Sequence, residues 1–318
     1  MPSFSPSRVR TKIAASATIV ALIATVAPSH LHAQGTIDTS AGRSFDYYEA
    51  DDGNQRINLS GRLRMLSQRI PGMACNNAAG IEPSASQTNL AAAVDEFSLI
   101  LSGLEVGDQD LDIFGPEESR RVLGGIKQLR ARWEPFQDQA LVVLEQQSYD
   151  HAVNELAAAS LPLLRDAQVL VGRIVERHYD RVLTIQSETF TIDFAGRQRM
   201  LAQQMSKNIC LIHSQDDPAQ ALEELKKGYV LFDATLDALQ QGMPQVGVSA
   251  PPNQTVADGL QVVDDAWVAL QPLLQAAMAG ERFNEATRVQ LFHDLNTLTG
   301  KMNEAVKMYV KASALGSA

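Results

Sequence analysis

The stretch INLSGRLRMLSQR at residues 57–69 decides the fold, because the chain repeats it as IDFAGRQRMLAQQ at residues 192–204. The two stretches lie 135 residues apart, and further residues of uncommon types keep the same offset. The pairs are Gly61 and Gly196, Arg64 and Arg199, Cys75 and Cys210, Phe97 and Phe232, and Gly107 and Gly242, while Trp133 and Trp267 pair at an offset of 134. The chain is therefore an internal duplication.

Both copies carry the apolar spacing of amphipathic helices. Apolar residues recur three and four positions apart, and no segment alternates as a half-buried strand does. In the first copy we expect helices over about residues 54–78, 84–104 and 117–146 and from 149 onward, separated by turn-forming residues. Four such helices with short connections close into a bundle. The sequence predicts an all-α fold of two tandem four-helix bundles, over residues 45–186 and 187–315.

The first residues are typical of a secretory signal peptide. Arg8, Arg10 and Lys12 precede an apolar run at residues 13–27, which is short for a membrane span. Ala33 then offers a small residue at a cleavage position. We expect a signal peptide over residues 1–33, cleavage before Gln34 and a periplasmic mature chain. We expect no membrane span after cleavage, because no later segment contains about eighteen consecutive apolar residues.

The composition excludes one class of partner. Of the 318 residues, 45% are hydrophobic and 20% are charged, and the formal net charge is −10. Such a surface repels nucleic acid, so we expect no nucleic-acid partner. A small anion can still bind where arginines locally reverse the field.

The repeated block places an arginine one helical turn after a glycine. At about 100° per residue, Gly61 and Arg64 share one helix face, and so do Gly196 and Arg199. Glycine costs about 1 kcal/mol relative to alanine inside a helix, so its presence in both copies indicates a close approach to the backbone. A close contact between such faces would bury like charges unless an anion, with acceptors that match the guanidinium fork, lay between them. The alternative is that each arginine is a solvated helix residue.

The block resembles the first-helix signature of the NarX/PilJ-type periplasmic sensor domains, which occur in nitrate and nitrite sensor kinases and in methyl-accepting transducers of type IV pili. The resemblance rests on Gly-x-x-Arg-Met in both copies and covers nearly the whole mature chain as two tandem domains. It implies that Arg64 and Arg199 bind a small oxyanion, nitrate or nitrite first, between two first helices. The chain departs from the nitrate sensors at Leu59 and Phe194, where those sensors carry a lysine.

The sequence contains no pattern of an enzyme, a metal site or a cofactor site. Gly-x-Ser-x-Gly, Walker and dinucleotide motifs are missing, and the histidines have no partner at ligand spacing. We therefore expect a binding protein that is not an enzyme, has no signalling output domain of its own, and acts with a sensor or transport partner. The rival hypothesis is an interaction module whose glycine-arginine faces pack against another protein. The candidate ligand-binding residues are Arg64, Arg199, Gly61 and Gly196.

Two arrangements of the copies are compatible with the sequence. A heptad-spaced stripe of mostly apolar residues runs from Val171 into the second block, through a stretch that lacks glycine and proline. This pattern favours one helix that joins the copies end to end, so that a homodimer would supply the second half of each site. Side by side, Arg64 would face Arg199 and Cys75 would face Cys210, and one chain would clamp one anion.

Overall fold

The computed structural model describes residues 42–145, 149–179, 186–215 and 217–316, so the predicted signal peptide lies outside the described residues. Within these ranges the chain forms eight α-helices, two short 3₁₀ helices and no β-strand, which confirms the all-α prediction. The first copy contains α1 (Gly42–Ala78), α2 (Pro83–Val106), η1 (Gln109–Leu111), α3 (Arg120–Leu144) and α4 (Tyr149–Tyr179). The second copy contains α5 (Gln186–Ser214), α6 (Ala219–Gln241), η2 (Pro244–Val246), α7 (Gln254–Met278) and α8 (Glu285–Gly316).

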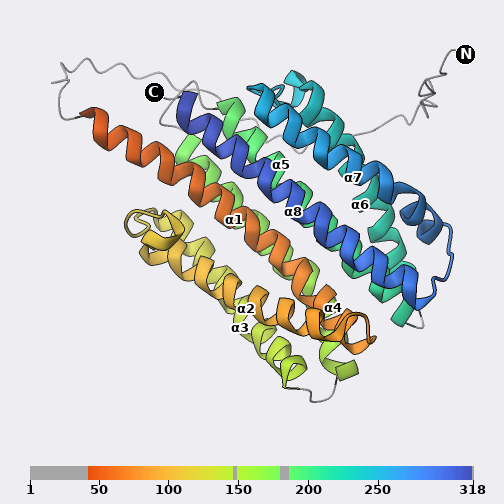
Figure 1. Ribbon diagram of the computed structural model, residues 1–318. Helices are drawn as coiled ribbons and strands as arrows, with labels where there is room; N and C mark the ends of the chain where they lie inside the picture. Colours follow the sequence, from red (N-terminus) through yellow and green to blue (C-terminus); the bar gives the residue numbers. More distant parts are fainter. Residues whose placement is uncertain (1–41, 146–148, 180–185, 216, 317–318) are drawn as a thin grey trace, which may run out of the picture. The chain divides into compact units, whose positions relative to one another are not determined.

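Each copy closes into a four-helix bundle (Figure 1). In the first copy α1 packs against α2 and α4, and α3 completes the ring; α5, α6, α7 and α8 repeat this arrangement. The third helix of each bundle begins at a side-chain cap. Ser119 accepts a hydrogen bond from the backbone N–H of Val122, and Asn253 accepts one from the backbone N–H of Val256.

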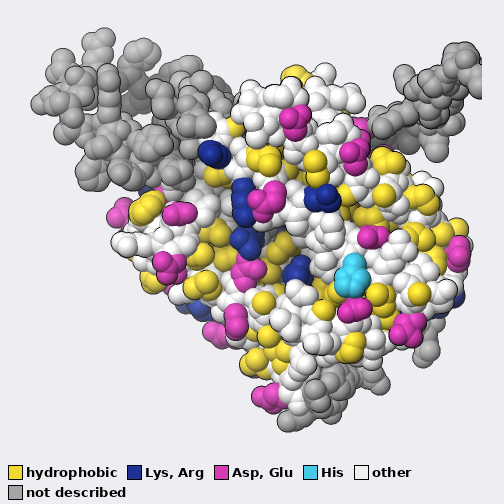
Figure 2. All heavy atoms as spheres, in the orientation of Figure 1, with side chains coloured by type: hydrophobic (Ala, Val, Ile, Leu, Met, Phe, Trp, Pro, Cys, Tyr) yellow, Lys and Arg dark blue, Asp and Glu magenta, His cyan; other side chains and the backbone are white. Residues whose placement is uncertain are grey.

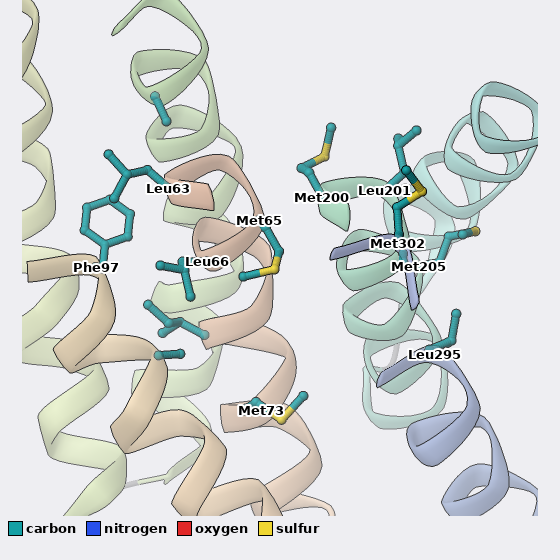
Figure 3. Close-up of a cluster of buried hydrophobic side chains, with 14 of the residues drawn as sticks. Leu63, Met65, Leu66, Met73, Phe97, Met200, Leu201, Met205, Leu295 and Met302 are labelled. Carbon is teal, nitrogen blue, oxygen red and sulfur yellow. The ribbon is translucent and has the colours of Figure 1, made fainter. Parts of the chain in front are cut away.

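The duplication extends into the packing of the cores. In the first bundle Trp133 stacks on Phe97 with ring centroids 3.9 Å apart, and in the second Trp267 packs on Phe232 at 4.4 Å. Both tryptophans are buried, which confirms that they belong to the cores. Figure 3 shows Leu63 and Phe97 grouped in one bundle and Leu201, Met205 and Met302 grouped in the other. No helix of the described ranges is both long and apolar enough to cross a membrane.

The two bundles meet along α1 and α5, which lie side by side. A Cβ atom on Gly72 of α1 would lie 3.4 Å from the Cα atom of Lys207 on α5. Further along, Cys75 is disulfide-bonded to Cys210, with Cα atoms 6.1 Å apart and a sequence separation of 135. Both pairs keep the offset of the duplication. The helices α1 and α5 are therefore parallel, and equivalent residues lie opposite each other.

The end-to-end arrangement that the heptad stripe favoured is wrong. On α1, Arg64 bonds Gln168 of α4, whereas Gln68, which lies further along α1, bonds Ser160, which lies earlier on α4. The helix α4 thus runs antiparallel to α1 and to α5. Residues 180–185, through which the continuous helix was expected to run, lie outside the described residues. The stripe was misleading because α4 and α5 each bury an apolar face against α1, so the same spacing serves two helices.

The disulfide gives a first prediction. Mass spectrometry of the non-reduced monomer should find the peptides of Cys75 and Cys210 linked within one chain. Replacing both cysteines with alanine should lower the free energy of unfolding by about 2–5 kcal/mol, because the bond restricts the unfolded chain. Urea denaturation of the two proteins measures this difference. Free thiols, or links between two chains, would contradict the parallel packing of α1 and α5.

Candidate functional site

Gly61 of α1 and Gly196 of α5 lie against the same two side chains. A Cβ atom on Gly61 would lie 3.3 Å from Nη2 of Arg64 and 3.6 Å from Nη2 of Arg199. A Cβ atom on Gly196 would lie 3.4 Å from Nη2 of Arg199 and 3.6 Å from Nη2 of Arg64. The groups that approach both glycines closely are therefore the two guanidinium groups, and the like charges lie next to each other.

Arg64 is fully buried and has a charged partner. Its Nη2 donates to Oδ1 of Asp193 at 2.6 Å, and its Nη1 donates to Oε1 of Gln168 at 3.1 Å. The Asp193 side chain is only 7% exposed and also accepts from Nη2 of Arg197 at 2.8 Å. The ion pair between Arg64 and Asp193 links α1 of the first copy to α5 of the second.

Arg199 is as deeply buried as Arg64, but among the described residues its guanidinium donates hydrogen bonds only to uncharged oxygen atoms. Its Nη1 donates to Oδ1 of Asn303 at 2.8 Å. Its Nη2 donates to the backbone oxygen of Asn58 at 3.3 Å. The guanidinium of Arg199 is thus held in place without a carboxylate in contact with it.

The partners of the two arginines follow the duplication. Gln168 of α4 and Asn303 of α8 occupy equivalent places, and both accept from an Nη1 atom. Asp193 and Asn58 are also equivalent, and the backbone oxygen of each accepts from an Nη2 atom. The two-fold symmetry is broken at this second pair, because only Asp193 adds a carboxylate.

Burial dominates the electrostatics of the site. It lowers the pKa of the Arg64 guanidinium, while Asp193 beside it opposes this shift. Burial lowers the pKa of the Arg199 guanidinium to about 9, and the charges of Arg62 and Arg64 add to this effect. Burial alone would raise the pKa of the Asp193 carboxyl, but Arg64 and Arg197 hold it below its usual value. At neutral pH the buried groups are two cations and one anion, so one positive charge is uncompensated.

We call the contact between α1 and α5 around Arg64 and Arg199 the seam. Several polar atoms of the two repeated blocks are buried without a hydrogen-bond partner among the described residues, and three of them belong to the two arginines and Asn58. They are Nε of Arg64, Nε of Arg199 and Oδ1 of Asn58. Buried donors normally find an acceptor in folded proteins. The two Nε–H groups therefore give the seam unused capacity to donate to an acceptor.

Partly exposed charges surround the seam. Arg62 forms an ion pair with Glu96 of α2, and Arg197, which pairs with Asp193, lies over the ring of Phe194 at 5.2 Å. Figure 2 shows Lys and Arg side chains gathered near the middle of the face that α1 and α8 form, whereas Asp and Glu are spread across the face. Asp and Glu side chains also lie next to these basic groups, so the surface charges are largely paired and the uncompensated charge is that of the buried Arg199.

The structure brings together all four residues that the sequence singled out, but within one chain. Sequence reasoning missed the side chains that orient the arginines. The difference between INLSG and IDFAG already contained one signal, because a single residue changes from an amide to a carboxylate one turn before the glycine. Gln168 and Asn303 have no signal in the sequence around them, apart from the offset of 135 residues that they share with the repeated block. The missed residues are Asn58, Asp193, Gln168 and Asn303.

Comparison with known families identifies both copies of the duplication. The model for the PilJ family, described as the N-terminal region of the type IV pili methyl-accepting chemotaxis transducer, matches residues 49–159 and 185–290. Each matched segment contains one glycine-arginine block, and the two together cover more than half of the chain. No match was found among curated proteins. The match confirms the resemblance seen in the repeated block: the chain belongs to the PilJ family and contains two tandem copies of its domain.

Proposed function

We propose that the chain is a periplasmic sensor-type protein that binds one small oxyanion, nitrate or nitrite, between Arg64 and Arg199. The observation that carries the proposal is the state of Arg199. Its guanidinium is buried and charged, lies beside a second cation, and donates only to neutral oxygens. Gly61 and Gly196 give both guanidinium groups room to reach the same place.

An anion bound between Arg64 and Arg199 would offset two unfavourable energies, the lost hydration of a buried cation and the repulsion between two cations. A buried cation without a counter-ion has lost its hydration without compensation. A neighbouring cation adds repulsion, which a low effective dielectric strengthens. A small planar oxyanion would reduce both and would also accept from the Nε–H groups of Arg64 and Arg199 that have no partner. Nitrate and nitrite have this size, shape and charge.

The rival hypothesis of an interaction module is less compatible with the packing. It assigns the glycine-arginine faces to contacts with another protein. Those faces pack against each other within one chain, and Gly61, Arg64, Gly196 and Arg199 are all buried. The same packing removes the reason for a homodimer, because α1 and α5 together supply both halves of the site.

The periplasm is the compartment that fits this protein best. The disulfide between Cys75 and Cys210 is of the kind that persists in oxidising compartments. A signal peptide over residues 1–33 would deliver the chain there. The family description names chemotaxis transducers, so a signalling protein is the partner class that we favour over a transport protein.

We assign no catalytic role to the seam. Its charged groups are arginines, which donate hydrogen bonds and remain protonated at neutral pH, and a carboxylate that is already paired with them. No group of three or more His, Cys, Asp and Glu side chains that could hold a metal occurs in the described part of the chain. Holding an anion, without converting it, is the chemistry that these side chains support.

Calorimetric titration at pH 7 should show one nitrate or nitrite bound per monomer. Arg199→Ala and Arg64→Ala should each weaken binding by at least about tenfold, because a charge-assisted hydrogen bond contributes about 1.5–3 kcal/mol. Arg121→Ala is a matched control, since the Arg121 side chain is 65% exposed and pairs with Glu176, which contacts neither Arg64 nor Arg199 in any hydrogen bond or ion pair of the described residues. This control should bind as the unmodified protein does. Absence of heat with both anions, or unchanged heat in Arg199→Ala, would refute the assignment.

Nitrate should also stabilise the folded chain. At a concentration a hundred times its Kd, nitrate should add about 2.7 kcal/mol and raise Tm by roughly 5 °C. The reason is that the anion binds the folded seam and not the unfolded chain. Differential scanning fluorimetry measures the shift, which should vanish in Arg199→Ala. An equal rise in that variant would reveal a general salt effect instead.

A further inference from the structure

The seam has two halves, one around Arg64 and one around Arg199. They differ in charge at one pair of equivalent residues, Asp193 and Asn58. Asp193 on α5 and Asn58 on α1 each stand three residues before the glycine of their block. Asp193 is buried and binds Nη2 of Arg64 through its carboxylate at 2.6 Å. Arg199, in the other half, reaches only the backbone oxygen of Asn58 at 3.3 Å. One half therefore contains a carboxylate of the protein itself, and the other half does not.

The charges of the buried side chains determine how much negative charge a ligand can bring to the seam. Arg64 and Arg199 contribute two positive charges, and Asp193 contributes one negative charge. The outer pair of Arg62 and Glu96 is neutral as a unit, and each side chain is about 30% exposed, so water screens it. Arg197 also pairs with Asp193, but its side chain is 38% exposed, so water screens its charge as well. One buried positive charge remains, and it belongs to the half at Arg199.

We propose that Asp193 sets the charge and shape of the ligand, because it occupies the Arg64 half as a built-in counter-ion and leaves the Arg199 half for one planar monovalent oxyanion. This inference rests on the proposed function and adds to it the class of ligand and the residue that selects it. Divalent oxyanions such as sulfate are excluded from the unmodified protein.

The Asp193 side chain itself indicates which shape of anion an arginine of this pair binds. The Asp193 carboxylate is a planar oxyanion bound to one arginine of a two-fold pair. Nε and Nη2 of Arg197 donate to the same carboxylate. Beside Arg199 the equivalent residue is Asn58, whose side chain donates to Gln55, and the Nε–H of Arg199 has no partner. A planar anion of similar size matches that place, whereas a tetrahedral dianion brings more charge than the seam leaves uncompensated. Asn58 is partly buried as a residue, whereas Asp193 is buried, but Oδ1 of Asn58 itself is buried and has no hydrogen-bond partner among the described residues.

The experiment compares four proteins that differ in one or two atoms at this pair. Asp193→Asn opens both halves and leaves two buried positive charges, whereas Asn58→Asp fills both halves and leaves none. The double variant Asn58→Asp/Asp193→Asn exchanges the halves and keeps one positive charge. Each protein is titrated with nitrate, nitrite and sulfate by calorimetry at pH 7 and low salt.

The unmodified protein should bind nitrate or nitrite and not sulfate. Asp193→Asn should bind these monovalent anions at least about tenfold more tightly, or bind sulfate as well, since a nearby negative charge has been removed. Asn58→Asp should bind none of the three anions. The double variant should recover binding of the monovalent anions without sulfate, which distinguishes a charge effect from damage to the fold.

Several outcomes overturn the inference. If the unmodified protein binds nitrate and Asp193→Asn changes neither affinity nor selectivity, the proposed function stands and the role of Asp193 is refuted. Unchanged binding in Asn58→Asp refutes it as well. If only Asp193→Asn binds an anion, the inferred counter-ion is supported and the proposed function of the unmodified protein fails. If none of the four proteins binds any of the three anions, both fail.

Folding is checked independently in every variant. The bond between Cys75 and Cys210 should form in each protein, and far-ultraviolet circular dichroism should match that of the unmodified chain. Should Asp193→Asn fail to fold, Asp193→Ser removes the same charge with a smaller side chain. It is expected to give the same gain in anion affinity, and a lack of gain in this folded variant refutes the inference.

Discussion

Two buried arginines that lie side by side are the constraint on which the rest of this structure depends. Arg64 and Arg199 repel each other, and burial has removed the water that would screen them. The fold contains several features that make this arrangement tolerable. Two glycines make room for the guanidinium groups, Asp193 neutralises one of them, and neutral oxygens from α4 and α8 hold both in place. One positive charge remains without a carboxylate in contact with it, and this is the feature on which the proposed anion site rests.

The duplication explains how one chain maintains such a seam. The helices α1 and α5 carry the same block and lie parallel, and the disulfide between Cys75 and Cys210 fixes them at one end. Each helix is also anchored in its own bundle of four. Because both halves belong to one chain, they can differ in sequence, which two copies in a symmetric dimer cannot do. Asp193 and Asn58 are such a difference, and it places the counter-ion on one side only.

The sequence predicted the helices and the residues of the seam but not how the two copies meet. Periodicity, glycine and proline positions determine helices locally, and a shared offset exposes the duplication, so these features were accessible. The choice between one long helix and a chain reversal between the copies depends on the contacts that α4 and α5 each make with α1. A hairpin expected near residues 187–191 is wrong in its position, because α5 runs through these residues. An apolar stripe at heptad spacing is compatible both with one continuous helix and with two separate helices that each pack against α1. Pairing of the cysteines was visible as an option and was decided by packing between distant segments.

The partners of the arginines were hidden for a related reason. Gln168 and Asn303 lie 104 residues from the arginines that they bind, on helices whose orientation the sequence did not determine. Asp193 lies within the repeated block, yet its partner is Arg64 of the other copy, 129 residues away. Local reasoning therefore identified the donors of the seam and missed its acceptors. The acceptors matter most for the proposed function, because they determine how much positive charge at the seam has no carboxylate partner.

The central claim is that one chain holds one anion between its own α1 and α5. A crystal structure of the protein grown with saturating nitrate tests it most directly. The account predicts a single planar anion in contact with Arg199, between the two repeated glycines of the same chain, with Asp193 still bound to Arg64. Density that shows only the guanidinium groups and Asp193 at the seam, or an anion held between two different chains, would contradict the account.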